Sequence, residues 1–429
     1  MSPLIFIFAL DLQMVIRKPI SPFTRMAMEP ISRFPLVESI EFLWKMLVPQ
    51  VSQSWEAMHS IHPKTLIPIN NFRAATITFR VAAIPVEIIF RFAHFFRVAS
   101  PPKVCYNGND TIVIHHPKEK IDGSEGTTGL RIHERLDNRD DIELLTIAPE
   151  LRKDPAERSR LINSSDITFL CLPDSAAREA VALVTNPNTR IIDASTAHRT
   201  EAGWAYGFPE LSAKHREAIR TGKRIANPGC HASGFISLVY PLIAGGILPA
   251  DYPVASFSLT GYSGGGKKMI AQYEASDRDA ELDAPREYGL SQQHKHLKEM
   301  RLITGLSRAP LFTPIVSDYY SGMVVNVPLY TDLLNTTQTP ESLQAFFADY
   351  YANEPFVKVM PLGAESEMSG FLSGNHLSGY DGMQIYITGN ENRIQLSSVF
   401  DNLGKGASGA AIQCFNIMTG CDETKGLNL

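Results

Sequence analysis

The sequence predicts an α/β protein in which a doubly wound parallel sheet is followed by an α+β domain. Three observations predict this fold class. Strand-like runs alternate with helical patterns from residue 121 onwards, extended runs follow one another after Cys230, and a sharp Asn-Pro-Gly turn at residues 227–229 separates the two regions. Alternating strands and helices are typical of a parallel sheet, whereas consecutive strands favour antiparallel pairing.

The first region gives the parallel sheet element by element. A glycine-rich turn and a helix with apolar spacing come first, then a strand, a second buried strand, a helix and a further strand. In chain order these segments are "IDGSEGTTGLRIHERL", "IELLTIA", "INSSDITFLCLP", "SAAREAVALV" and "TRIIDAST". We expect their strands to lie parallel in one sheet.

The second region begins with an apolar helix, "GFISLVYPLIAGGI", directly after Cys230. Its later strands are more antiparallel in character, and the chain ends with small and apolar residues suited to a closely packed helix. These later segments are "ASFSLTGYSGG", "FTPIVSDYYSGMVVNVPLY", "MQIYITGNENRIQLSSVFDNL" and the helical "KGASGAAIQCFNIMTG".

Composition limits the class of protein. With 429 residues the chain is long enough for two or three domains, and its formal net charge of -5 gives no global signal for nucleic acid. The five cysteines are far apart and show no zinc-ligand spacing, which favours a reducing compartment. We also expect no membrane span, because the apolar runs are short or interrupted by charges.

Residues 1–117 differ from the rest, because their charge is net positive whereas the remainder is net negative. We expect them to be an atypical extension that is loosely packed or disordered. The run Ile77 to Phe96 could alternatively be an amphipathic helix at a membrane surface. The segment before Gly123, "PKEKID", is polar where a buried parallel strand should be apolar. In the alternative interpretation, the run Thr111 to Ile114 replaces this missing first strand.

A glycine loop at the first strand-to-helix junction predicts a dinucleotide site. Glycines let the backbone approach a pyrophosphate, and the start of a helix offers free N–H groups. The loop consists of Gly123, Ser124, Glu125, Gly126, Thr127, Thr128 and Gly129. Arg152 and Lys153 lie where such folds read the adenine ribose, and basic side chains there favour NADP. A plain glycine turn and a solvated basic turn are the competing interpretations.

Cys230 is the candidate nucleophile. A helix starts just after it, and the helix dipole is expected to lower the pKa of the thiol. His294 and His296 are candidate bases, with Glu299 after them. A structural cysteine is the competing interpretation, and we expect no metal site because no third ligand cluster stands near the two histidines.

A second glycine-rich loop, "GYSGGGKK" from Gly261 to Lys268, suits an anionic phosphate group. Its competing interpretation is a flexible surface turn. Taken together, these parts describe one reaction type: a thiolate attacks an acyl phosphate, phosphate leaves, and NADPH reduces the resulting thioester to an aldehyde.

At this point the chain resembles the N-acetyl-γ-glutamyl-phosphate reductase family of arginine biosynthesis, in its shorter type 2 form. The resemblance covers about 310 residues and is carried by "IDGSEGTTGLRIHERL", "FLCLPDSAAREA", "IIDASTAHRT", "GWAYGFPEL", "ANPGCHASGF", "GYSGGGKKMI", "HKHLKEM" and "DNLGKGASGAA". It implies a cytoplasmic homo-oligomer, a dimer or tetramer, with a Rossmann-type domain that binds NADP. A catalytic domain like that of glyceraldehyde-3-phosphate dehydrogenase follows.

The resemblance also implies roles for individual residues. It makes Cys230 the nucleophile and places the base in the "HKH" stretch, where we prefer His296 to His294. Asn402 would contact the nicotinamide amide, and Pro173 and Ser195 would join the cofactor site. The phosphate and substrate site would be made of Asn227, Ser263, Gly264, Gly265 and Lys267.

The expected domain organisation is an extension at 1–117, a cofactor domain at 118–229, a catalytic domain at 230–395 and a returning C-terminal helix at 396–429. Two other functions stay open at this point. An aspartate-semialdehyde dehydrogenase would share the thiol turn, and a non-catalytic dinucleotide-binding protein would keep Cys230 as a structural thiol.

Overall fold

The computed structural model describes residues 103–107, 111–115, 118–123, 126–137 and 139–429. The chain divides into two compact units, residues 1–115 and 116–429, and each is considered by itself. The expectation of a loosely packed extension at residues 1–117 falls mostly outside the described residues and stays a prediction.

In the first unit the described residues form an antiparallel hairpin of β1 (Lys103–Asn107) and β2 (Thr111–His115). The run Thr111 to Ile114 is therefore paired with β1. The alternative in which this run forms the first strand of the parallel sheet is wrong. That place is taken by β3 (Lys118–Asp122), which lies between β4 and β5.

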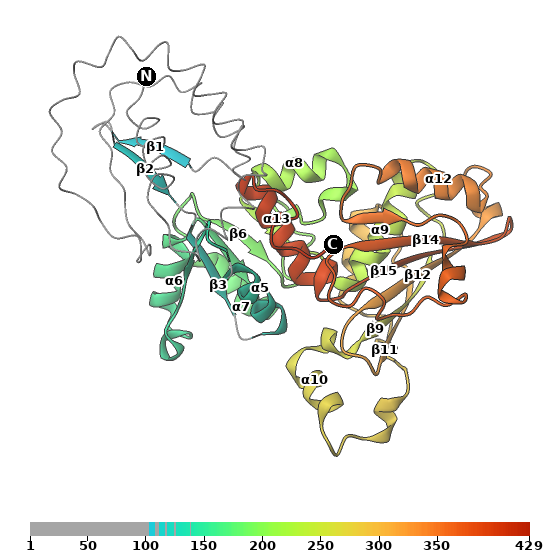
Figure 1. Cartoon of the computed structure of the whole chain (residues 1–429), viewed down its shortest axis with the longest axis horizontal. Coiled ribbons are helices and arrows are strands. Elements are labelled where there is room, and N and C mark those ends of the chain that lie inside the picture. The colour runs from blue at the N-terminus through green and yellow to red at the C-terminus, as the bar shows by residue number, and fades with distance from the viewer. Residues whose placement is uncertain (1–102, 108–110, 116–117, 124–125, 138) are drawn as a thin grey trace, which may run out of the picture. The chain divides into compact units, whose positions relative to one another are not determined.

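The parallel sheet of the second unit has the strand order β4-β3-β5-β6-β8-β7 among the described residues, and every adjacent pair is parallel. This topology confirms the predicted doubly wound class. Its other strands are β4 (Glu143–Leu145), β5 (Ile167–Leu170), β6 (Arg190–Asp193), β7 (Ala205–Tyr206) and β8 (Arg224–Ala226), and its helices are α5 (Thr127–Asp137), α6 (Pro155–Ser164), α7 (Asp174–Ala182) and α8 (Ala213–Thr221). Figure 1 shows α5, α6 and α7 around β3 and β6.

The polar first strand has an unusual interior. Glu119 and Lys120 are both fully buried on β3, and neither side chain has a hydrogen-bond partner among the described residues. The nearest opposite charge to Lys120 is Asp122, 4.0 Å away, and Asp122 is itself paired with Arg158 at 2.8 Å. Backbone pairing with two neighbours keeps this segment in the sheet although its side chains suit a buried strand poorly.

The second sheet has, among the described residues, seven strands in the order β10-β11-β9-β12-β15-β14-β13. It is mixed, because β11 pairs with β9 in parallel whereas β12 pairs antiparallel with both β9 and β15. Two of the predicted extended runs each split into two strands. The strands are β9 (Ala255–Gly261), β10 (Arg286–Glu287), β11 (Leu311–Ser317), β12 (Met323–Tyr330), β13 (Val357–Val359), β14 (Met383–Gly389) and β15 (Arg393–Phe400).

One face of this sheet packs against α9 (Cys230–Ala244), whose residues are almost all buried. Gly234 allows this contact, since a Cβ there would come within 2.5 Å of Val325 and 2.7 Å of Ser398. The other helices are α10 (Gly266–Glu274), α11 (His296–Thr304), α12 (Pro340–Tyr350) and α13 (Gly409–Thr419).

The last helix returns to the parallel sheet after the seven-stranded sheet is complete. α13 contributes Ile412, Phe415 and neighbouring apolar side chains to the core that also holds Ile121 and Phe169 of the parallel sheet. In Figure 1, α13 lies between the sheet with β6 and the sheet with β14 and β15. Residues 402–407 lie just before α13, and several of them line a cavity between the two sheets.

Candidate active site

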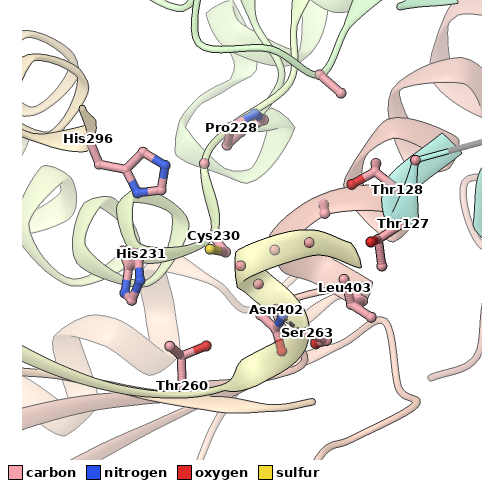
Figure 2. A pocket seen from close by; sticks show the side chains of 18 of the residues that line it. Thr127, Thr128, Pro228, Cys230, His231, Thr260, Ser263, His296, Asn402 and Leu403 are labelled. Atoms are coloured by element: carbon pink, nitrogen blue, oxygen red, sulfur yellow. Dashed lines mark hydrogen bonds between the residues drawn. The ribbon is translucent and has the colours of Figure 1, made fainter. Parts of the chain in front are cut away.

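A cavity of about 500 Å³ lies where the two sheets meet. Segments from both sheets line it, among them the start of α5, the turn into α9, the loop between β9 and α10, the start of α11 and the segment before α13. Figure 2 shows Cys230 inside this cavity, with His296 on one side and Thr127 and Thr128 on the other. Predicted site residues from both halves of the chain therefore share one space.

Cys230 is the first residue of α9, as the sequence predicts. The turn before it is packed so closely that a Cβ on Gly229 would come 2.3 Å from Arg199 Nη1 and 2.4 Å from His296 Nε2. From the other side, Gly406 approaches the Cβ of Cys230, since a Cβ on Gly406 would be 2.9 Å from it. Only glycine at 229 and 406 allows this close approach.

A buried ionic cluster holds the turn in place. Arg199 donates from Nε to the carbonyl oxygen of Asn227 at 2.9 Å and pairs through Nη1 with Glu299 at 3.0 Å. The other carboxylate oxygen of Glu299 accepts from the Gly229 N–H at 2.9 Å and from the Tyr206 hydroxyl at 2.7 Å. Arg199 and Glu299 therefore fix the backbone that presents Cys230.

The expected lowering of the Cys230 pKa is wrong for this structure. Burial of the thiol raises its pKa, and this effect outweighs the nearby Arg199 charge and the backbone N–H of His231, which both lower it. Enclosure by protein atoms disfavours the thiolate more than the helix start favours it. The thiol is thus mostly protonated near neutral pH, so its reaction needs a proton acceptor.

Three histidines, His231, His294 and His296, line the same cavity as the thiol. The ring centroids of His294 and His296 are 4.7 Å apart, and that of His231 is 5.6 Å from His294 and 5.7 Å from His296. Burial lowers the pKa of His294 to about 4 and that of His231 to about 3, and it holds the pKa of His296 well below its usual value. All three rings are therefore neutral at physiological pH.

His294 and His296 differ in the hydrogen bonding of their Nδ1 atoms. His294 accepts at Nδ1 from the backbone N–H of His296, 3.2 Å away, so this nitrogen serves the start of α11. His296 is buried, and its Nδ1 has no hydrogen-bond partner among the described residues. No group of three or more His, Cys, Asp or Glu in the described part of the chain is placed to hold a metal ion.

The cofactor end of the cavity starts at α5. Gly126, Thr127, Thr128 and Gly129 line the cavity, and the buried Oγ1 of Thr127 has no partner among the described residues. Gly123 has a φ of +88°, and a Cβ there would be 2.4 Å from the carbonyl oxygen of Cys171. An unpartnered hydroxyl at a glycine-rich helix start fits a pyrophosphate. Ser124 and Glu125 lie outside the described residues.

Other predicted cofactor residues lie elsewhere. Arg152 and Lys153 are exposed in the loop after β4 and are not among the residues lining the cavity. Pro173, which precedes α7, is likewise exposed and does not line the cavity. Ser195 is buried, and its hydroxyl donates to Asp193 at 2.7 Å. These four residues were predicted to contact the cofactor rather than the thiol, and that role stays a prediction.

The predicted phosphate site is partly assembled. Ser263, Gly264 and Gly265 line the cavity, whereas Lys267 is exposed on α10 and does not. Asn402 also lines it and donates to the Ser263 hydroxyl at 3.0 Å, while its oxygen accepts from the Gly322 N–H at 2.8 Å.

Asn227 lies at the same cavity. Its amide nitrogen donates to the carbonyl oxygen of Ala407 at 2.9 Å, and its buried Oδ1 has no partner in the described part of the chain. An unpartnered acceptor is therefore available beside the thiol turn.

Sequence reasoning missed several residues of the site: Arg199, Tyr206, His231, Tyr288 and Lys295. Glu299 was noted only as a neighbour of the histidine pair. The one available signal for Arg199 was its place in "IIDASTAHRT", directly after a strand of the parallel sheet.

Comparisons with known proteins agree with this architecture. A family model described as "Semialdehyde dehydrogenase, NAD binding domain" matches residues 123–220. A second, described as "Semialdehyde dehydrogenase, dimerisation domain", matches residues 230–402.

Among solved structures, aspartate semialdehyde dehydrogenase II from Vibrio cholerae has a TM-score of 0.56 at 16% identity. The match covers 71% of this chain and 98% of that structure's chain. The aspartate semialdehyde dehydrogenase from Francisella tularensis has a TM-score of 0.56 at 15% identity, covering 70% and 99%. These likenesses show the fold.

Sequence relatives are more similar. The chain is 46% identical over 322 residues to "N-acetyl-gamma-glutamyl-phosphate reductase 2" from Nostoc sp., covering 73% of this chain and 100% of that protein. It is 48% identical over 302 residues to the N-acetyl-gamma-glutamyl-phosphate reductase from Chelativorans sp., covering 70% and 96%.

The fold and the two family models define an oxidoreductase of the semialdehyde dehydrogenase class with a nucleotide-binding domain. Within that class the chain belongs to the N-acetyl-γ-glutamyl-phosphate reductase family, in its type 2 form. No helix among the described residues is sufficiently long and apolar to cross a membrane.

Proposed function

We propose that this chain reduces N-acetyl-γ-glutamyl phosphate to N-acetylglutamate 5-semialdehyde with release of phosphate, as in arginine biosynthesis, through a thioester on Cys230. The observation that carries the proposal is the shared cavity. It holds a thiol at a helix start, neutral imidazoles and a glycine-rich helix start that fits a pyrophosphate. The family relatives at 46–48% identity support the same reaction.

Acylation comes first. His296 takes the proton of Cys230, and the sulfur attacks the acyl carbon. The bond between this carbon and the phosphate oxygen breaks, and phosphate leaves with the electron pair. The backbone of Ser263, Gly264 and Gly265 is available to hold the phosphate group, because these residues line the cavity.

Reduction follows at the thioester. When bound, the reduced nicotinamide supplies the hydride that converts the thioester into the aldehyde and releases the sulfur of Cys230. Arg199 and Glu299 keep the turn fixed during both steps, and the protonated His296 returns its proton to the departing sulfur. Thr127 and the start of α5 would hold the pyrophosphate, and Asn402 the nicotinamide end.

Cofactor choice is the finer part of the proposal. The family model supports a nucleotide-binding domain. We infer NADP because Arg152 and Lys153 follow β4, which is the neighbour of β3 and its glycine loop. Charge-assisted hydrogen bonds of about 1.5–3 kcal/mol to a 2′-phosphate predict that replacing both residues with Ala raises KM for NADPH at least tenfold. KM for NADH should hardly change, and an equal effect on both cofactors would count against this assignment.

The function is tested by steady-state NADPH oxidation with N-acetyl-γ-glutamyl phosphate, with β-aspartyl phosphate as the matched second substrate. We expect turnover with the first acyl phosphate and little with the second. Preference for β-aspartyl phosphate would identify the chain as an aspartate-semialdehyde dehydrogenase, and cofactor binding without turnover would identify a non-catalytic binding protein.

A further inference from the structure

A chain of hydrogen bonds runs beside the nucleophile and is not used by the mechanism above. The Oγ of Ser258 lies 2.7 Å from His231 Nδ1, and His231 Nε2 lies 2.6 Å from the hydroxyl of Tyr288. Ser258 is fully buried on β9, and His231 is buried in the first turn of α9. Tyr288 follows β10 and lines the cavity. This series of hydrogen bonds thus leads from the interior of the protein to the cavity wall.

The imidazole of His231 limits which groups donate and which accept in these two hydrogen bonds. Burial lowers the pKa of His231 to about 3, so the ring is neutral and carries a single N–H. A neutral imidazole has one donor and one acceptor nitrogen. Consequently one neighbour must donate to the ring and the other must accept from it.

The surroundings of Ser258 decide which of the two hydrogen bonds His231 donates and which it accepts. In the described part of the chain its hydroxyl has no hydrogen-bond partner except His231. If the ring donated to Ser258, the serine hydrogen would be buried without an acceptor, which is costly. The favoured arrangement therefore has Ser258 donating to Nδ1 and Nε2–H donating to the oxygen of Tyr288.

Because Tyr288 accepts from His231, its own O–H is left to donate elsewhere. Burial raises the pKa of Tyr288, so the phenol stays protonated and neutral. Its neighbours include His294, whose ring centroid is 5.8 Å away, and Val316. The phenol is thus a donor whose hydrogen is directed away from His231.

We propose that the Tyr288 hydroxyl donates a hydrogen bond to an oxygen of the acyl substrate, and that Ser258 and His231 are positioning residues that aim this hydrogen. The proposal rests on the acyl phosphate reduction proposed above and assigns one part of its substrate site. Ser258 touches no substrate, so any effect of changing it must act through His231.

Kinetics of single and double variants test the proposal. Tyr288→Phe and Ser258→Ala are each expected to lower kcat/KM for N-acetyl-γ-glutamyl phosphate about 3- to 10-fold, as expected for loss of one neutral hydrogen bond. KM for NADPH should not change. The double variant should be no worse than Tyr288→Phe, because both changes remove the same contact. Ser256→Ala is the matched control, since Ser256 is a buried serine on the same face of β9.

Two kinetic outcomes would overturn the proposal: an unaltered kcat/KM in Ser258→Ala, or losses in the two single variants that multiply in the double variant. An equal loss in Ser256→Ala would also overturn it, because it would assign the effect to packing of β9.

A spectroscopic measurement is independent of turnover. Nitrogen NMR of the ¹⁵N-histidine-labelled wild type, with the His231 signals assigned by their absence in His231→Gln, should show the proton on Nε2. A proton on Nδ1 would overturn the proposed direction. An inactive wild type with the proton on Nε2 would instead overturn the proposed function alone, so the two failures are distinguishable.

Discussion

At the scale of single residues, the reactivity of Cys230 is a balance between burial and charge. Burial raises the pKa of the thiol, while Arg199 and the N–H of His231 lower it. The thiolate is the reactive form, and its fraction grows as pH rises toward the thiol pKa. Alkylation of Cys230 by iodoacetamide in the free enzyme should therefore accelerate from neutral into alkaline pH. A rate that is already constant below pH 7 would contradict a raised pKa.

The two histidines at the start of α11, His294 and His296, are expected to contribute unequally. His296→Asn should lower kcat about 10²–10⁴-fold, the usual loss for a general base. His294→Asn should cost less, since Nδ1 of His294 accepts from the N–H of His296 and serves the helix start. Steady-state kinetics of both variants with N-acetyl-γ-glutamyl phosphate measure this. If His294→Asn is the more damaging variant, the base is His294.

The role of a site residue was predictable where its sequence neighbours define its surroundings. It was not predictable where the partners meet only in the folded protein. Cys230 follows a Pro-Gly turn and begins a helix, so its place could be read from neighbouring residues. Arg199 and Glu299 are 100 positions apart and meet only in the folded chain. The pKa of Cys230 was predicted in the wrong direction because the helix start is visible in the sequence but the surrounding burial is not.

At the scale of elements, β3 contains a buried carboxyl that destabilises its sheet. Burial raises the pKa of Glu119 well above its usual value. An unfolded Glu ionises near pH 4.3, so the folded state pays no penalty below that pH. The penalty grows as pH rises above 4.3, until Glu119 ionises in the folded state as well.

Glu119→Val should therefore stabilise the protein by about 1–3 kcal/mol at neutral pH, because Val suits a buried parallel strand. The urea midpoint of the variant should exceed that of the wild type more at pH 7.5 than at pH 4.5. Glu143→Val is the matched control, since Glu143 is exposed on the neighbouring strand. A lower midpoint for Glu119→Val at pH 7.5 would show that Glu119 has a stabilising partner.

Elements with a clear hydrophobic pattern were predictable, and β3 shows why others were not. The segments around β5, β6 and α9 are apolar and were expected as strands or a helix. Because the sequence of β3 is polar, the alternative in which the hydrophobic run of β2 supplies this strand stayed open. Strand pairing with β4 and β5, which no local pattern reveals, decided the outcome.

At the scale of the whole molecule, one face of the seven-stranded sheet carries exposed apolar side chains. Leu311 is 68% exposed, Tyr330 60% and Phe257 37%, and their strands β11, β9 and β12 are adjacent. The matching family model is described as a dimerisation domain. We expect this face to be covered by a second copy of the chain, because large exposed apolar patches mark interfaces.

Phe257→Glu should therefore dissociate the oligomer, since it places a charge inside an apolar interface. Size-exclusion chromatography with light scattering gives the mass. Leu302→Glu on α11 is the matched control, because Leu302 is exposed on a helix rather than on this sheet face. A wild type that is monomeric, or a Phe257→Glu variant with the oligomeric mass of the wild type, would exclude this interface.

The proposed catalysis passes through a thioester on Cys230, and intact-protein mass spectrometry can detect this intermediate. Wild-type enzyme is mixed with N-acetyl-γ-glutamyl phosphate in the absence of NADPH, quenched in acid and compared with Cys230→Ser. We expect that one N-acetylglutamyl group is added to the wild type, that a proteolytic fragment places it on Cys230, and that added NADPH removes it. The serine variant should gain nothing, because its hydroxyl is ionised too weakly to attack. An unmodified wild type that nevertheless oxidises NADPH with this substrate, or a serine variant with nearly full activity, would contradict the covalent mechanism.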